Sequence, residues 1–241
     1  NVFMNNWSAN VNSFTGGFNE EYQLILTSNF YSAIWDNTYI RTNNFDLIID
    51  SEFPNYENHK AIAKIMKSFY MQYIVDLYGD CPYSQAFDVA NSTPAYDSDS
   101  AIYPRLIDEI DEAIALINNN TVTTLPVGQE DVIYGGDMTQ WVKFANTLKL
   151  RILMRQATLA ESNGEAATYL NEQFNRLQRD FITTSATVQP GYSKRKKWFC
   201  RAVPGCRDLY SSPCYLPNKC LNEDQKHLQT SEMIMLLLCD Q

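Results

Sequence analysis

Apolar residues recur at intervals of three and four over much of this chain, which is the spacing of an amphipathic α-helix. Over residues 59–78 the apolar face consists of Ile62, Ile65, Met66, Phe69, Tyr73 and Leu77. Lys60, Lys64 and Lys67 share another face. Gly79 can adopt the left-handed conformation that ends a helix, and Pro82 prevents the helix from resuming. The pattern therefore predicts a helix over 59–78.

A second helix is predicted from the run of N-capping residues at 97–100 to the asparagines at 118–120. We expect Pro104 to lie in its first turn, where the missing N–H costs little. Its apolar stripe consists of Leu106, Ile110, Ile114 and Ile117, and its acidic residues, Asp108, Glu109, Asp111 and Glu112, are expected on the solvated side.

A third helix is predicted after residues 135–137, where Asp137 and Gln140 have the spacing of a capping box. Its stripe runs from Trp141 to Leu159. A fourth helix, roughly 165–177, follows a short turn at 162–164, so we expect a helical hairpin with antiparallel partners.

Upstream, residues 20–49 are predicted to be helical with a break near 27–29. The apolar face of this segment consists of Phe30, Ile34, Tyr39, Phe45 and Ile48. A strand signal is limited to Val122–Leu125. The predicted fold class is all-α, with helix pairs stacked as an α-solenoid, although no exact internal repeat is visible.

The charge excludes some classes of partner. The formal net charge is −9 at pH 7 over 241 residues, so nucleic acid and anionic lipid surfaces would be repelled. Aromatic residues make up 13% of the chain, which suggests stacking surfaces as well as a core. No segment approaches the roughly 20 apolar residues of a membrane-spanning helix.

The composition changes abruptly near residue 193. Residues 1–192 hold 11 Lys+Arg and 23 Asp+Glu, whereas residues 193–241 hold 8 and 5. Five of the six cysteines lie in this last segment. We expect residues 193–241 to be non-native sequence, such as an out-of-frame end, or a disordered tail. A small disulfide or zinc module is a third interpretation, although the cysteine spacing fits no usual ligand pattern.

Three motifs resemble the SusD/RagB-like family. The first is residues 70–86, where an aromatic helix ends in Tyr78-Gly79-Asp80-Cys81-Pro82-Tyr83-Ser84. The second is the helix around 102–114, and the third is the Trp141-Val142-Lys143-Phe144-Ala145-Asn146 segment with the residues up to Arg151. Their order and separation also match, and the resemblance covers about residues 20–192, as the N-terminal part of such a protein.

The resemblance implies a fold of tetratricopeptide-like helix pairs, truncated at its C-terminus. It also implies a non-catalytic binding subunit that captures glycans or peptides at the surface of the outer membrane of Bacteroidetes-type bacteria. The implied partner is a TonB-dependent, SusC-like transporter, and the implied membrane link is a lipid on an N-terminal cysteine that this sequence lacks. No cofactor is implied.

Candidate ligand-binding residues are aromatics at helix ends or in loops, with amides and an acid nearby to bind hydroxyls. They are Trp7, Trp35, Tyr39, Asn43, Asn44 and Asp46. The Tyr78–Tyr83 motif is interpreted instead as a helix stop followed by a turn. Trp141, Asn146 and Arg151 are likewise interpreted as structural, with Asn146 fixing a loop carbonyl.

Catalysis has little support in the sequence. The chain has two histidines, of which His59 heads a predicted helix and His227 lies in the cysteine-rich tail, so no Ser/His/Asp or metal-ligand constellation can be assembled from them. The adjacent acids of residues 108–112 are expected on a solvated face, where raising a carboxyl pKa is difficult. Two alternatives to a binding subunit stay open, namely a helical protein-interaction scaffold and a glycan-processing enzyme with paired carboxylates.

Overall fold

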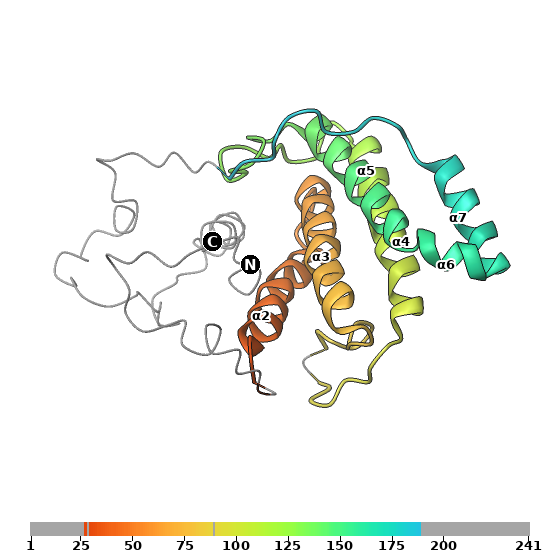
Figure 1. The fold of residues 1–241 in the computed structure, drawn as a ribbon. Helices are drawn as coiled ribbons and strands as arrows, with labels where there is room; N and C mark the ends of the chain where they lie inside the picture. The colour runs from red at the N-terminus through yellow and green to blue at the C-terminus, as the bar shows by residue number, and fades with distance from the viewer. Residues whose placement is uncertain (1–26, 28, 89, 189–241) are drawn as a thin grey trace, which may run out of the picture. The chain divides into compact units, whose positions relative to one another are not determined.

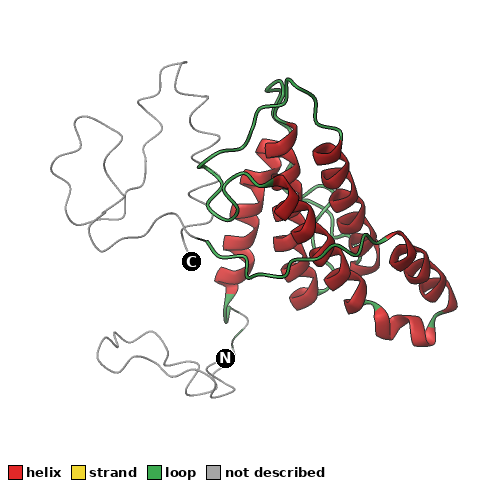
Figure 2. Ribbon diagram, turned by 90° about the horizontal axis from the view of Figure 1, so that it is seen from above, coloured by secondary structure: helices red, strands yellow, loops and turns green. Residues whose placement is uncertain are grey.

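The structure of this chain is a computed structural model that describes residues 27, 29–88 and 90–188 (Figures 1 and 2). Its helices are α2 (Ser32–Ile49), α3 (Glu57–Tyr78), α4 (Asp99–Asn118), α5 (Met138–Arg155), α6 (Ala157–Ser162) and α7 (Gly164–Arg176). The chain divides into two compact units, residues 1–39 and 40–241. The described residues form no β-strand, only one isolated bridge between Cys81 and Asp97. The predicted all-α class is confirmed.

Helices α3, α4 and α5 lie side by side (Figure 1). Lys64 near the start of α3 donates to Glu112 near the end of α4. Asp76 near the end of α3 accepts from Tyr103 near the start of α4, so the two helices are antiparallel. Arg151 of α5 donates to Gln72 of α3, and the apolar stripes of all three helices meet in one core. Its largest fully buried side chains include Trp141, Ile62, Ile65, Met71, Ile74, Ile102, Leu106, Ile107, Ile110 and Ile152. The predicted helix pairs therefore form by burial of these stripes.

The predicted helix ends are largely confirmed. Gly79 follows α3 with φ +74° and ψ −122°, so the expected positive φ is confirmed, although this ψ lies outside the left-handed helical region. Asp137 caps α5 by accepting from the N–H groups of Thr139 and Gln140. The reciprocal bond of a capping box is replaced, because the Asp137 N–H donates to the Tyr134 carbonyl.

The connection between α4 and α5 is organised by the buried carboxylate of Asp131. Its two oxygens accept from the N–H groups of Ile133, Tyr134 and Gly136, at 3.0–3.1 Å, and from the indole Nε1 of Trp141 at 2.7 Å. Four donors around one carboxylate satisfy a group that would otherwise be costly to bury. The same residues place Trp141 at the start of α5.

Gly136 allows a second close approach in this connection. Its φ is +88°, and a Cβ at this position would lie 2.0 Å from the carbonyl oxygen of Val127. Only glycine fits this arrangement without a shift of the backbone.

The predicted strand at Val122–Leu125 is wrong. These residues form a turn in which the Thr124 N–H donates to the Thr121 carbonyl, and Val122 is fully exposed. The Leu125 N–H instead donates to the carbonyl of Asn55, before α3. These β-branched residues favour a strand, but they lie in the connection between α4 and α5, where the described residues provide no neighbouring strand for them to pair with.

Two details of the predicted helices also differ. Pro104 lies in the second turn of α4, because the helix begins at Asp99. The predicted stripe to Leu159 breaks, since α5 ends at Arg155 and Leu159 is half exposed in the separate helix α6. The hairpin partner of α7 is therefore the short α6, and Asn163 caps α7.

Three side chains of α3 have environments that periodicity did not predict. Tyr73 and Leu77 belong to the predicted apolar face, yet they are 47% and 58% exposed. Lys67, expected on a different face from the apolar residues, is buried. A helical period shows which residues share a face, and the neighbouring segments determine whether that face is covered.

After α7 the chain runs back along α5 (Figure 1). The Asn146 amide donates to the Asp180 carbonyl at 3.3 Å, and the Ile182 N–H donates to Thr147 Oγ1 at 3.1 Å. The expected role of Asn146 in fixing a loop carbonyl is confirmed. Among the described helices, none is long and apolar enough to cross a membrane.

Candidate ligand-binding surface

The predicted aromatic residues fall in the first compact unit or outside the described part of the chain. Trp7 lies outside the described residues. Trp35 and Tyr39 lie one turn apart on α2, and their ring centroids are 4.9 Å apart with the planes tilted by 48°. The helix therefore holds the two rings next to each other.

The predicted polar residues belong to the second unit. Asn43 and Asn44 are half-buried on α2. Asp46 is engaged elsewhere, since its Oδ1 lies 2.8 Å from the ammonium of Lys67 on α3. The ligand-binding role of all these residues stays a prediction.

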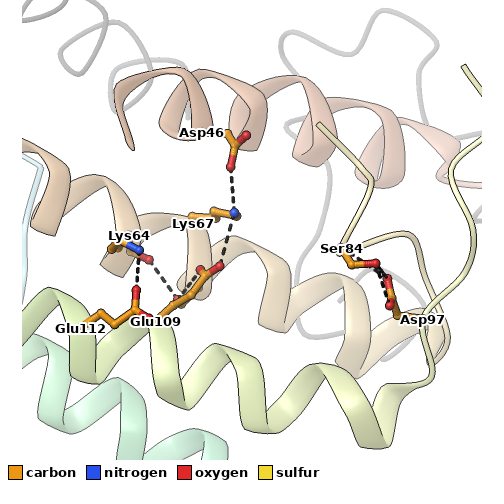
Figure 3. A network of polar contacts seen from close by, with 8 residues as sticks. Asp46, Lys64, Lys67, Ser84, Asp97, Glu109 and Glu112 are labelled. Carbon is orange, nitrogen blue, oxygen red and sulfur yellow. Dashed lines mark hydrogen bonds and ion pairs between the residues drawn. The ribbon is translucent and has the colours of Figure 1, made fainter. Parts of the chain in front are cut away.

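Lys67 is the centre of a buried charge cluster, which we define as Asp46, Lys67 and Glu109 (Figure 3). The ammonium lies 2.8 Å from Asp46 of α2 and 3.4 Å from Glu109 of α4. Burial acts to lower the pKa of Lys67, but the charges of Glu109 and Asp46 outweigh it and raise that pKa above its ordinary value. One cation thus ties three helices together.

The connection between α3 and α4 is held by Asp97 and Asp80. The Asp97 carboxylate accepts from the Tyr83 N–H, from the Ser84 N–H at 2.8 Å and from the Ser84 hydroxyl at 2.9 Å (Figure 3). Burial acts to raise the pKa of Asp97, but the donors from Ser84 and Tyr83 together outweigh it and hold that pKa below its ordinary value. Asp80 accepts from the Asp99 N–H at the start of α4. The Tyr78–Tyr83 motif is therefore a helix stop and turn, as predicted.

A partly exposed aromatic surface lies on α3 and α5, and sequence reasoning missed it. Tyr73 packs edge-on against Phe69, with ring centroids 5.3 Å apart. The Arg151 guanidinium lies 4.9 Å from the Phe69 ring centre and 5.7 Å from that of Tyr73. Arg151 is fixed in turn by its Nε, which donates to Gln72 at 2.9 Å. We call Phe69, Tyr73 and Arg151 the aromatic platform.

Two of the described carboxyl groups, Glu109 and Glu130, lack the environment of a general acid. A general acid needs a raised pKa. Glu130 has the opposite shift, because N–H donors and the neighbouring His59 lower its pKa despite partial burial. Glu109, expected on a solvated face, is paired with Lys67. No metal-binding group of His, Cys, Asp and Glu occurs in the described residues.

Comparison with known proteins gives one family match. Residues 1–204 match a SusD-like family described as "Starch-binding associating with outer membrane". The match ends inside the basic, cysteine-rich segment that begins at residue 193. No curated protein matches the chain.

Several solved structures resemble the chain over part of their length. A chitin-binding protein is 33% identical over 62% of this chain, with a TM-score of 0.51. A chitin-binding SusD homolog from Flavobacterium johnsoniae is 29% identical over 65% of the chain, with a TM-score of 0.53. A SusD/RagB family protein from Bacteroides thetaiotaomicron is 27% identical over 66%, with a TM-score of 0.55. The chain spans 32% of the length of each of these proteins.

Proposed function

Because this chain belongs to the SusD-like family, whose members are described as starch-binding and associated with the outer membrane, we propose that it is part of a non-catalytic glycan-binding subunit. In this proposal, the subunit captures oligosaccharides at the cell surface and delivers them to a TonB-dependent, SusC-like transporter. A lipid anchor on a longer form of the protein holds it at the outer membrane.

The observation that carries the proposal is the aromatic platform. Tyr73 presents 47% of its surface to solvent, although a large ring of this kind normally gains free energy by burial. Its position is fixed by Phe69 and by Arg151, which is itself bonded to Gln72. A rigid, exposed ring beside a guanidinium suits a sugar, since the ring stacks on C–H groups and the cation donates to hydroxyls.

Two named relatives suggest the first ligands to test. The chitin-binding proteins point to N-acetyl chitooligosaccharides, and the family description points to maltooligosaccharides. Both are neutral, which agrees with a chain of net charge −9 that has no general affinity for polyanions.

Isothermal titration of the chain with both oligosaccharide series tests the proposal. We expect saturable binding of at least one series, with the ligand recovered unchanged by chromatography. Tyr73→Ala should weaken binding by about tenfold, the loss expected from one aromatic stacking contact of about 1.4 kcal/mol. Tyr96→Ala is the matched control, because Tyr96 is an exposed tyrosine on the connection between α3 and α4.

Two results would contradict the proposal. One is the absence of saturable binding to any oligosaccharide or peptide together with stable capture of a partner protein, which would favour an interaction scaffold. The other is release of shortened products that stops when one carboxylate is replaced, which would indicate an enzyme.

A further inference from the structure

A cavity of about 310 Å³ lies between α4, α5 and the residues that follow α7. Its polar lining consists of Asp111, Asn118, Asn146, Lys149, Arg176 and Gln178, with Ile114 supplying an apolar wall. The volume lies at the lower end of the range for small-molecule sites, roughly 300–1,000 Å³. The cavity therefore suits one small polar molecule rather than a chain of sugar units. It is formed by a different set of residues from the aromatic platform.

Lys149 is the buried charged group of this cavity. The residue is 3% exposed, and its ammonium lies 2.6 and 2.7 Å from the two oxygens of Asp111. The Lys149 ammonium has three N–H donors, and both of the acceptors identified for it among the described residues are oxygens of Asp111. Asp111 is half exposed, so the pair extends from the interior to the rim of the cavity.

The lining has a net positive charge on an otherwise acidic protein. The negative charge of Asp111 offsets the positive charge of Lys149, and Arg176 at the end of α7 adds a second positive charge. The nearby carboxylate of Asp180 lies 3.4 Å from Lys143 and is paired there. Arg176 is exposed, and its position in the last turn of a helix is electrostatically favourable for a cation.

We propose that this cavity binds a carboxylate-bearing monosaccharide unit, a uronate, at the end of a captured glycan. The Arg176 fork matches the geometry of a carboxylate, and the Lys149 ammonium contributes a further donor. The amides of Asn118, Asn146 and Gln178 provide donors and acceptors for the ring hydroxyls, and Ile114 faces the apolar side of the ring. The sugar nature of this ligand rests on the proposed function above, whereas the preference for an acid rests on the charges of the cavity.

The test is to titrate the whole chain with glucuronate, glucose and acetate. Isothermal calorimetry measures the affinity, and NMR measures the chemical shifts of the backbone amides of the lining residues. We expect glucuronate to bind more tightly than glucose or acetate and to shift residues of α4, α5 and 176–178 together. Arg176→Gln should weaken glucuronate binding by about tenfold, the effect of one charge-assisted hydrogen bond. Arg179→Gln, three residues along and also exposed, should leave it unchanged.

Each alternative outcome overturns the inference. Equal binding of glucose and glucuronate would show that the charge of the cavity selects nothing. Equal binding of acetate and glucuronate would show that a bare carboxylate is the ligand, and an unaffected Arg176→Gln variant would place the acid elsewhere. A parallel titration with a neutral oligosaccharide separates this inference from the proposed function, because the aromatic platform can bind that ligand whether or not the cavity binds glucuronate.

Discussion

The indole N–H of Trp141 donates to the carboxylate of Asp131 across 2.7 Å in a buried setting. This bond joins the first turn of α5 to the connection that precedes it. Because the same carboxylate also accepts three backbone N–H groups, one side chain determines the path of that connection.

Asp131→Asn should destabilise the chain. An amide keeps one acceptor oxygen and turns an NH₂ group toward two buried donors, so about 2–4 kcal/mol of unfolding free energy should be lost. Chemical denaturation measures the change. Asp137→Asn is the control, because asparagine caps a helix as well as aspartate does. Equal losses in the two variants would contradict the role of Asp131.

Gly136→Ala should also destabilise the chain, and more than Gly79→Ala. Both glycines have positive φ, so both substitutions carry a backbone penalty of about 1–3 kcal/mol. Only the Cβ at residue 136 meets a backbone atom, the Val127 carbonyl oxygen at 2.0 Å, whereas the Cβ at residue 79 meets nothing. The collision should add a further 1–3 kcal/mol or so. Thermal unfolding of the two variants compares them, and a larger effect at residue 79 would contradict the close approach.

Lys67→Met should cost about 2–4 kcal/mol, since it leaves the carboxylates of Asp46 and Glu109 partly buried without their cation. Lys64→Met removes the pair with Glu112, whose side chain is 62% exposed, and should cost less than about 1 kcal/mol. Urea titrations of both variants give the comparison. Similar small losses would mean that the buried charge cluster contributes little to stability.

Acidification should destabilise the fold through His59 and Glu130. Burial lowers the pKa of His59 below 6.5, although Glu130 acts in the opposite direction. The unfolded chain therefore binds more protons than the folded chain below about pH 6.5, and the unfolding free energy falls as the pH drops. The pKa of Glu130 is lowered too, so its contribution is present above its unfolded value of 4.5 and is lost as the pH falls through the lower folded value.

His59→Gln should remove the loss of unfolding free energy that His59 causes as the pH falls below about 6.5. Urea unfolding at a series of pH values between about 7 and 5 measures it. A variant with the same pH profile as the parent would rule out His59 as the source.

Trp35→Ala and Tyr39→Ala test the predicted ligand-binding residues. If their paired rings stack on a sugar, each substitution should weaken oligosaccharide binding by about fivefold to tenfold. Titration calorimetry measures the affinity, and circular dichroism checks that α2 is retained. Unchanged affinity in both variants would leave the aromatic platform as the better candidate.

The sequence predicted the helices because their apolar periodicity is local information. Gly79 and Asp137 marked helix ends for the same reason, since their roles depend on neighbours within a few residues. The false strand at 122–125 arose where propensity was read without knowledge of a pairing partner. Leu125 bonds to Asn55, which lies seventy residues earlier.

The candidate site was harder to predict, because its members are set by contacts between distant helices. Asp46 looked like an available acid, but its partner Lys67 lies 21 residues away. Tyr73 looked like a core residue, and only the arrangement of α3 against α5 shows that its ring is exposed. Whether a side chain is a ligand contact or a structural support depends on such non-local packing.

Helices α3 and α5 run in the same direction, since Phe69 of α3 lies against Phe144 and Asp76 pairs with Arg155. This parallel contact has a consequence for how the chain assembles. Helices α6 and α7 are joined by residue 163 alone, so their packing closes a short loop at little entropic cost, whereas α3 and α4 pack on each other across a connection of twenty residues, 79–98. The bond from Arg151 to Gln72 joins residues 79 apart, so it can form only after the intervening segments have collapsed. We expect the hairpins to fold early and rapidly, and the docking of α5 onto α3 to be the late step that sets the folding rate.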